Sequence, residues 1–212
     1  PKINDYLDLL EQEFILYNKK IGKVKISTAY IGGGTPTIMS LTQLDRLYKI
    51  IKTYFDISSI EEFTLEGCPE TMTEDKIKQG LDNGIDRISI GVESFNDDIL
   101  AKMNRRHESI QSMHTIEIAK KIGISIDIDI IRCYPGYSEQ MVVDDVNIIN
   151  DVRPNSITTY KYNLKPSSID IKKNIPFLTS KQVKEQTLLY YEGLKLGGYS
   201  QHHIDWFVKQ DK

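Results

Sequence analysis

The chain has 212 residues, of which 40% are hydrophobic and 27% are charged, and its formal net charge is −3. This composition supports one domain with a sizeable core and excludes a largely disordered chain. The small negative charge without a basic run argues against nucleic-acid binding, and no apolar run approaches the roughly 18 residues of a transmembrane helix. With two cysteines and no signal peptide in the opening residues, the sequence predicts a cytoplasmic protein.

Hydrophobic periodicity predicts alternating helices and strands. An apolar stripe predicts a helix over residues 4–18, and period-two alternation predicts a strand over residues 24–30 with Val24, Ile26, Thr28 and Tyr30 on its buried face. Further strands are expected at residues 62–66, 87–92, 124–130, 156–162 and, as a short last strand, 204–208. Helices are expected from residue 41 onward, at residues 73–83, 96–103, 109–121 and 138–150, and from residue 179 to the glycines at 197–198, while residues 166–176 are loop-like.

The order of one strand followed by one helix repeats five times along the chain. Such alternation implies parallel strands joined by right-handed crossovers. Five units are too few for a closed (β/α)8 barrel, so we expect an α/β fold with an open or partial barrel or a doubly wound sheet. In either case a ligand is expected at the carboxyl ends of the strands.

A glycine-rich stretch joins the first predicted strand to the helix that follows. It covers residues 30–37 (YIGGGTPT) and precedes a capping box at Ser40 and Gln43. Glycines allow the backbone to take unusual dihedrals and to approach a ligand closely. The spacing is neither the dinucleotide fingerprint nor a P-loop, and a tight turn without a ligand is the alternative interpretation.

Polar residues fall at or just after the ends of several predicted strands. They are Glu66, Glu93, the triplet Arg105-Arg106-His107 and Asp129. Because the carboxyl ends of parallel strands meet at one edge of a sheet, these residues and the glycine stretch are expected to share a ligand site.

Together, five stretches resemble the radical S-adenosylmethionine enzymes, and most closely the oxygen-independent coproporphyrinogen III oxidase-like branch. They are residues 30–37, 63–70 (FTLEGCPE), 86–95 (DRISIGVESF), 104–107 (NRRH) and 127–131 (DIDII), the last followed by Pro135-Gly136. The resemblance covers roughly residues 3–208. It implies that residues 1–212 are a partial radical S-adenosylmethionine core domain, a (β/α)6 TIM-like barrel without its first strand. The strand predicted at residues 24–30 would then be an exposed edge.

The resemblance also implies a site for S-adenosylmethionine across the strand ends. The residues that it assigns to this site are Gly33, Gly34, Thr35, Glu66, Glu93, Arg105 and Asp129. By this likeness the backbone of the glycine stretch would hold the methionyl amino end, and the Arg105 guanidinium would pair with the methionyl carboxylate. The three carboxylates would accept hydrogen bonds from amino or ribose hydroxyl groups.

The chain departs from the family pattern at several positions. Glu93 stands where Gln is usual, Cys68 stands where Asn is usual, and residues 133–137 (CYPGY) replace Gly-Leu-Pro-Gly-Gln. The family binds a [4Fe–4S] cluster through Cys-x3-Cys-x2-Cys ahead of the first helix, and Cys68 and Cys133 do not have this spacing. We therefore expect the cluster only where an N-terminal segment supplies those cysteines. The chain is interpreted as a fragment of a longer enzyme, with a degenerate natural protein as the alternative.

The resemblance implies that the longer protein cleaves S-adenosylmethionine reductively to a 5′-deoxyadenosyl radical. A porphyrin- or haem-related substrate and a reductant such as flavodoxin or ferredoxin are expected, and the isolated chain is expected to be inactive. Three alternatives are a haem-binding or haem-trafficking protein on the same scaffold, a radical methyltransferase, and an α/β barrel that binds phosphate through Arg105-Arg106-His107.

Cysteine and histidine residues suggest two further candidate sites. Cys68 and Cys133 could bind a metal such as zinc together with His107 or His114, or they could be free thiols. The pair His202-His203 could contact haem or a metal, although neighbours on a strand point to opposite faces.

Overall fold

The computed structural model describes residues 2–163 and 177–210 of the chain. Its helices are α1 (Lys2–Ile21), the 3-10 turn η1 (Pro36–Ile38), α2 (Leu41–Tyr54), α3 (Glu74–Asp82), α4 (Asp97–Lys102), α5 (Ser109–Ile122), α6 (Glu139–Val152) and α8 (Ser180–Leu196). Its strands are β1 (Val24–Lys25), β2 (Thr28–Ile31), β3 (Phe55–Asp56), β4 (Glu62–Gly67), β5 (Arg87–Glu93), β6 (Ser125–Arg132), β7 (Ser156–Lys161), β8 (Tyr199–His203) and β9 (Trp206–Lys209). Helices and strands alternate as predicted, and the loop prediction for 166–176 lies outside the described residues.

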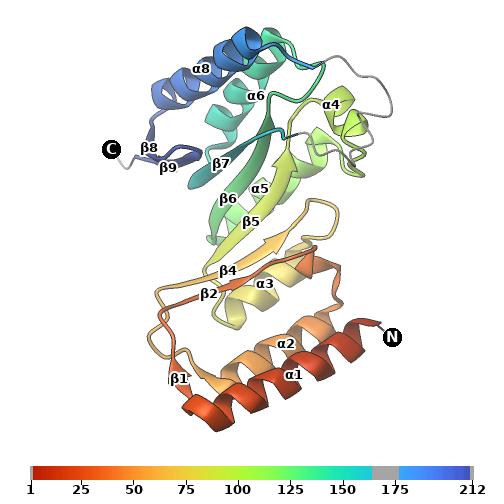
Figure 1. Cartoon of the computed structure of the whole chain (residues 1–212), viewed down its shortest axis with the longest axis vertical. Coiled ribbons are helices and arrows are strands. Elements are labelled where there is room, and N and C mark those ends of the chain that lie inside the picture. Colours follow the sequence, from red (N-terminus) through yellow and green to blue (C-terminus); the bar gives the residue numbers. More distant parts are fainter. Residues whose placement is uncertain (1, 164–176, 211–212) are drawn as a thin grey trace.

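Seven strands form one sheet in the order β2-β4-β5-β6-β7-β9-β8. The first five run parallel to their neighbours, whereas β9 lies antiparallel to both β7 and β8. Within the described residues the sheet does not close on itself, so the α/β fold is an open, partial barrel, as predicted (Figure 1). Among the residues that the structure describes, strand β2 pairs only with β4, so it is an edge of this sheet, as predicted.

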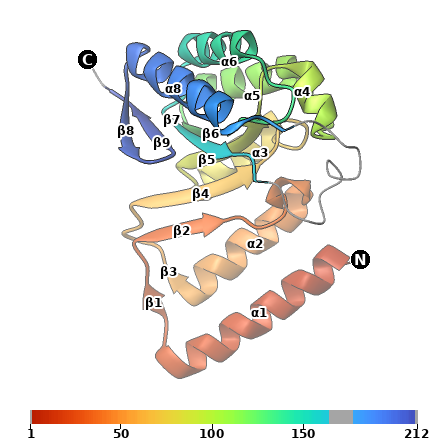
Figure 2. The same ribbon diagram turned by 45° about the horizontal axis from the view of Figure 1, so that its top comes forward.

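The helices cover one face of this sheet, which we call the outer face. Successive helices contact one another in the order α1, α2, α3, α5, α6 and α8. Helix α1 lies at one end of the molecule and the β8–β9 hairpin lies toward the other (Figure 2). No helix in the described part of the chain combines the length and the apolar character that crossing a bilayer requires.

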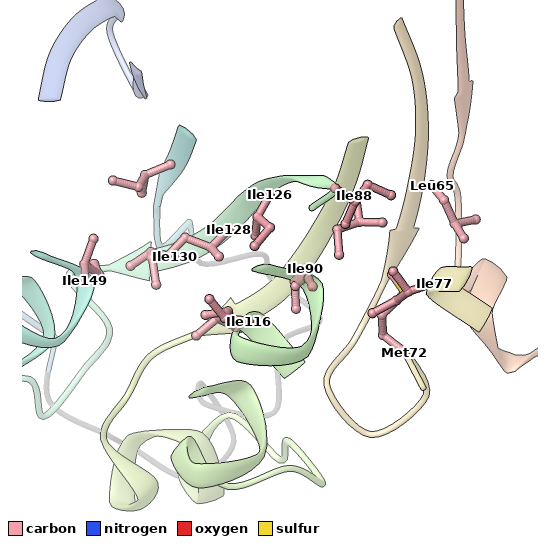
Figure 3. Packing of buried hydrophobic residues seen from close by; sticks show 14 of the residues in the cluster. Leu65, Met72, Ile77, Ile88, Ile90, Ile116, Ile126, Ile128, Ile130 and Ile149 are labelled. Atoms are coloured by element: carbon pink, nitrogen blue, oxygen red, sulfur yellow. The ribbon is translucent and has the colours of Figure 1, made fainter. Parts of the chain in front are cut away.

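Isoleucine side chains of β5 and β6 fill the outer face. They are Ile88, Ile90, Ile126, Ile128 and Ile130, each at most 1% exposed. Figure 3 shows them together with Ile116 from α5 and Ile149 from α6. Because each fully buried side chain contributes about 1.5–3 kcal/mol, this cluster is a main source of stability.

Local signals begin and end the helices as predicted. Ser40 with Gln43 begins α2 in a capping box, and Thr179 with Gln182 begins α8 in the same way. Gly123, in the left-handed conformation with φ 85°, ends α5. The two capping boxes thus fix the first residues of α2 and α8, and Gly123 fixes the last residue of α5.

The prediction of one strand over residues 24–30 is wrong. The chain pairs first with β3 and then with β4, and the two short strands belong to different sheets. The partner changes at Ser27, whose carbonyl oxygen accepts from Glu61 N instead of continuing along β3. The alternation of buried and exposed side chains therefore does not run through residues 24–30. In β2 Ala29 is half-buried, whereas Tyr30, predicted on the buried face, is 53% exposed.

The end of the chain is also more regular than predicted. The expected short strand is present as β9, but it forms a hairpin with β8, whose residues Ser200 to His203 are polar and largely exposed. Since β8 lacks an alternating apolar pattern, hydrophobic periodicity does not reveal it.

Candidate functional site

A pocket of about 230 Å³ lies at the carboxyl ends of β2, β4, β5 and β6. We call it the inner pocket, and its lining residues are Gly33, Gly34, Thr35, Glu66, Gly67, Cys68, Ser89, Gly91, Glu93, Arg105 and Asp129. All seven residues that the sequence predicted for the site are among them. They come from four strand ends and the connection after α4, so the fold brings together positions far apart in the sequence.

A larger pocket of about 330 Å³ lies between α1, β2 and α2. Its lining includes Tyr6, Leu10, Phe14 and Ile51 and contains no charged side chain. We assign the ligand site to the inner pocket because specific recognition of a charged ligand needs convergent charged groups, which only the smaller of these two pockets has.

Glu66 holds the glycine loop at one side of the inner pocket. Its Oε2 atom accepts a hydrogen bond from Gly33 N at 3.0 Å, and Oε1 accepts from Tyr30 Oη at 2.8 Å. A Cβ atom on Gly32 would lie 2.7 Å from Glu66 Oε2 and 2.7 Å from Tyr30 Cε1, so any larger residue here would displace these two side chains. Gly33 has φ +117°, and a Cβ atom there would meet nothing within 4 Å, so the loop presents open backbone to the pocket.

The two aspartates of β6 have different surroundings. Asp127 is 2% exposed, and its Oδ2 lies 3.2 Å from Arg87 Nη2. Asp129 is two residues nearer the strand end and accepts a hydrogen bond from Ser89 Oγ at 3.1 Å. Burial, followed by the nearby charge of Asp127, raises the pKa of Asp129 to about 7, although the Ser89 hydrogen bond opposes this. Asp129 therefore changes its protonation state near neutral pH.

Glu93 and Arg105 form an ion pair across the inner pocket. Glu93 Oε1 lies 2.5 Å from Arg105 Nη2, and the side chains are 10% and 38% exposed, respectively. Burial raises the pKa of Glu93, while the charge of Arg105 opposes that shift. The sequence predicted that both residues lie in one site but not that they pair with each other.

Four lining residues were missed by the sequence prediction of the site. Ser89 and Gly91 share a face of β5 with Glu93, so period-two alternation counted back from Glu93 could have found them. Gly67 and Cys68 follow Glu66 directly at the end of β4. The sequence analysis marked Cys68 as a departure from the family pattern and as a candidate metal ligand, but not as a residue of this site.

The structure does not bring the side chains of Arg105, Arg106 and His107, the triplet considered for phosphate, into one pocket. His107 is 3% exposed and points into the protein, with Nε2 3.0 Å from the Val92 carbonyl oxygen. Its Nδ1 lies 3.2 Å from Glu70 Oε2. His107 therefore supports the connection after α4, and of the three residues Arg105 alone lines the inner pocket.

The two cysteines do not share a site. Cys68 Sγ lies 3.0 Å from Thr71 Oγ1, whereas Cys133 Sγ lies 3.7 Å from the Val183 carbonyl oxygen of α8. In the part of the chain that the structure describes, no three His, Cys, Asp or Glu side chains gather closely enough to hold a metal ion. His202 packs its ring against Trp206, with 5.5 Å between the ring centroids.

Comparison with known proteins identifies relatives over most of the chain. The chain matches the model of the Radical SAM superfamily over residues 2–149. It is 34% identical over 168 residues to the heme chaperone HemW of Lactococcus lactis, covering 79% of this chain and 43% of that protein. It is 26% identical over 217 residues to the oxygen-independent coproporphyrinogen III oxidase of Escherichia coli, covering 99% of this chain and 47% of that protein. The chain thus spans about half the length of the curated relatives that it matches.

The fold agrees with these relatives. The solved structure of coproporphyrinogen III oxidase from Escherichia coli superposes with a TM-score of 0.90 at 24% identity, covering 100% of this chain and 50% of that one. This likeness shows the shared fold, and the family model covers well over half of the chain. The chain belongs to the radical S-adenosylmethionine superfamily, in the branch related to coproporphyrinogen III oxidase.

Proposed function

We propose that the inner pocket binds S-adenosylmethionine and that residues 1–212 are the core domain of a longer enzyme acting on a porphyrin or haem. The observation that carries this proposal is the convergence of open glycine backbone, three carboxylates and one guanidinium in one pocket. S-Adenosylmethionine is a cation with an amino group, a carboxylate and two ribose hydroxyl groups. Each of these groups has a complementary partner in the pocket.

The residues fit this ligand in the following way. The backbone of Gly33, Gly34 and Thr35, together with Glu66, would hold the amino end, because the loop is open there and Glu66 is an acceptor. Arg105 would bind the carboxylate through its partly exposed guanidinium. Asp129 would accept hydrogen bonds from the ribose.

The family also uses a [4Fe–4S] cluster, which when bound supplies the electron that cleaves the sulfonium and yields the 5′-deoxyadenosyl radical. This chain contains two cysteines, and Cys68 and Cys133 lie apart, so its own residues do not offer three thiolates to a cluster. In this proposal the chain positions the ligand, and the thiolates and a reductant such as flavodoxin or ferredoxin come from elsewhere.

Ligand binding by the isolated chain tests the proposal. We expect S-adenosylmethionine and S-adenosylhomocysteine to bind with Kd of about 0.1–1 mM, or roughly −5.5 to −4 kcal/mol, in calorimetry or ligand-observed NMR. Arg105→Ala should weaken both ligands because it removes a charge-assisted pair, whereas Arg106→Ala is the matched control outside the pocket. Asp129→Asn should weaken S-adenosylhomocysteine more than methionine, which has no ribose.

Two results would contradict the proposal. One is the absence of binding to the wild-type chain at several millimolar ligand. The other is equal affinity of wild type and Arg105→Ala for S-adenosylhomocysteine.

Haem handling is the second candidate function, because the relative with 34% identity is named a heme chaperone. A haem titration of the same chain, followed by absorption in the Soret region, separates the two. Stoichiometric haem binding without binding of S-adenosylmethionine would favour the haem-handling function for this part of the protein.

A further inference from the structure

The backbone directs Glu93 into the inner pocket in an unusual way. Glu93 has φ 68°, and the pairing of β5 with β6 shifts register between Gly91 and Glu93. A Cβ atom on Gly91 would lie 3.1 Å from Glu93 Oε1, so the Glu93 side chain folds back across its own strand. This conformation brings the carboxylate to Arg105, at 2.5 Å, instead of leaving it to extend beyond the strand end.

The charges around Glu93 come from three elements. Arg105 and His107 lie in the connection after α4, Asp129 lies on β6, and Glu66 lies on β4. With all acids ionised, the lining of the inner pocket carries three carboxylates and one guanidinium. Since Glu93 neutralises that guanidinium, Glu66 and the ionised form of Asp129 give the pocket a net negative charge that attracts a cation.

We infer that Glu93 is a specificity-determining residue: it occupies Arg105 and so weakens the contact of that guanidinium with the carboxylate of either ligand, while its own negative charge attracts the sulfonium, so that the pocket prefers the cationic sulfonium ligand over its neutral thioether counterpart. This inference rests on the proposed function, because it takes S-adenosylmethionine and S-adenosylhomocysteine as the ligands. The first has a net charge of +1 and the second has none, and they otherwise differ by one methyl group. The remaining guanidinium surface of Arg105, whose side chain is 38% exposed, stays accessible to a ligand.

The variant Glu93→Gln removes the charge and keeps the size of the side chain. We expect S-adenosylhomocysteine to bind this variant about two- to fivefold more tightly, the range that a partly solvated ion pair supports. S-Adenosylmethionine should gain less, because its sulfonium loses one attracting charge. The Kd of S-adenosylhomocysteine divided by the Kd of S-adenosylmethionine is therefore expected to fall toward one. Calorimetry at constant pH and ionic strength measures both values.

Three controls isolate the effect. 5′-Methylthioadenosine lacks the amino-acid carboxylate, so its affinity should not change in Glu93→Gln. Glu61→Gln removes the charge of an exposed acid outside the pocket and should leave the ratio unchanged. In the double variant Glu93→Gln/Arg105→Ala, S-adenosylhomocysteine should lose the gain seen with Glu93→Gln alone.

The pH dependence gives an independent readout. Because burial raises the pKa of Glu93, lowering the pH should protonate it before an exposed glutamate and tighten S-adenosylhomocysteine binding to the wild type relative to Glu93→Gln. The charge of Glu93 also contributes to the raised pKa of Asp129, so the comparison is made in the Asp129→Asn background, where the remaining pH-dependent difference reports Glu93.

An unchanged Kd ratio, or weaker S-adenosylhomocysteine binding in Glu93→Gln, would overturn the inference and make Glu93 a positioning residue for Arg105. If none of the three adenosyl ligands binds either protein, the proposed function fails together with the inference. If both ligands bind both proteins with the same ratio, only the inference fails.

Discussion

Along β4, β5 and β6 the two faces of the sheet differ in chemistry although the same strands provide both. The outer face carries buried apolar side chains such as Leu65, Ile90 and Ile128, which pack under the helices. The opposite, inner face carries charged side chains, including Asp127 and Asp129. The packing of the outer face stabilises the fold. The inner face can therefore contain buried charges, whose burial costs free energy but which can bind a ligand.

The largest expected effect comes from the outer face. Ile128→Ala should lower the free energy of unfolding by about 2–5 kcal/mol, because it leaves a cavity at a fully buried position. Urea denaturation followed by circular dichroism measures the change. Ile38→Ala, at a position 67% exposed, is the matched control and should change stability by less than about 0.5 kcal/mol. Equal effects of the two variants would contradict the assignment of the outer face as the core.

A smaller effect is expected deep on the inner face. Asp127→Ala should cost about 1–3 kcal/mol, since it removes the nearer of the two carboxylates that pair with the mostly buried Arg87 guanidinium and leaves only Glu62, at 3.5 Å. Asp8→Ala breaks an ion pair with Arg46 at the exposed surface and should cost less than about 1 kcal/mol. Both values come from denaturant unfolding at pH 7. An Asp127→Ala variant as stable as wild type would show that the pair between Arg87 and Asp127 does not stabilise the folded state.

The next effect sharpens the contrast between the two inner aspartates. The folded-state pKa of Asp129 is raised to about 7. Between about pH 4 and pH 7 the folded protein therefore keeps a proton on Asp129 that the unfolded chain has already released. This group therefore makes the wild type less stable with rising pH, whereas Asn does not titrate. The stability of Asp129→Asn relative to wild type should increase by roughly 2–3 kcal/mol between pH 5 and pH 8. A pH-independent difference in urea midpoints would be the contrary result.

The smallest effect is expected at the edge of the sheet. Tyr30→Phe removes the hydrogen bond to Glu66 Oε1, but Tyr30 is 53% exposed, so water can replace the lost donor. Stability should fall by no more than about 0.5 kcal/mol. Tyr17→Phe, at another position 53% exposed, is the control. A loss above about 1 kcal/mol in Tyr30→Phe alone would mean that the glycine loop contributes to the core.

Much of the fold and the membership of the site follow from the sequence. The capping boxes at Ser40 and Thr179, the isoleucine alternation of β6 and the end of α5 at Gly123 are local signals within a few residues. Six of the seven predicted site residues lie in one pocket because parallel strands end at a common edge, and Arg105 reaches the same pocket from the connection after α4. The ligand roles of these residues stay predictions.

Tertiary structure alone decided the features that depend on partners distant in sequence. The region of residues 24–30 divides between two sheets because its pairing partner changes at Ser27, which alternation within the strand cannot reveal. Likewise, the Glu93–Arg105 pair depends on a left-handed residue at a register shift between two strands. The raised pKa of Asp129 depends on burial and on charges from neighbouring strands. Local patterns specify which element a residue belongs to, whereas its charge partners and degree of burial are set by strands and loops that meet only in the folded chain.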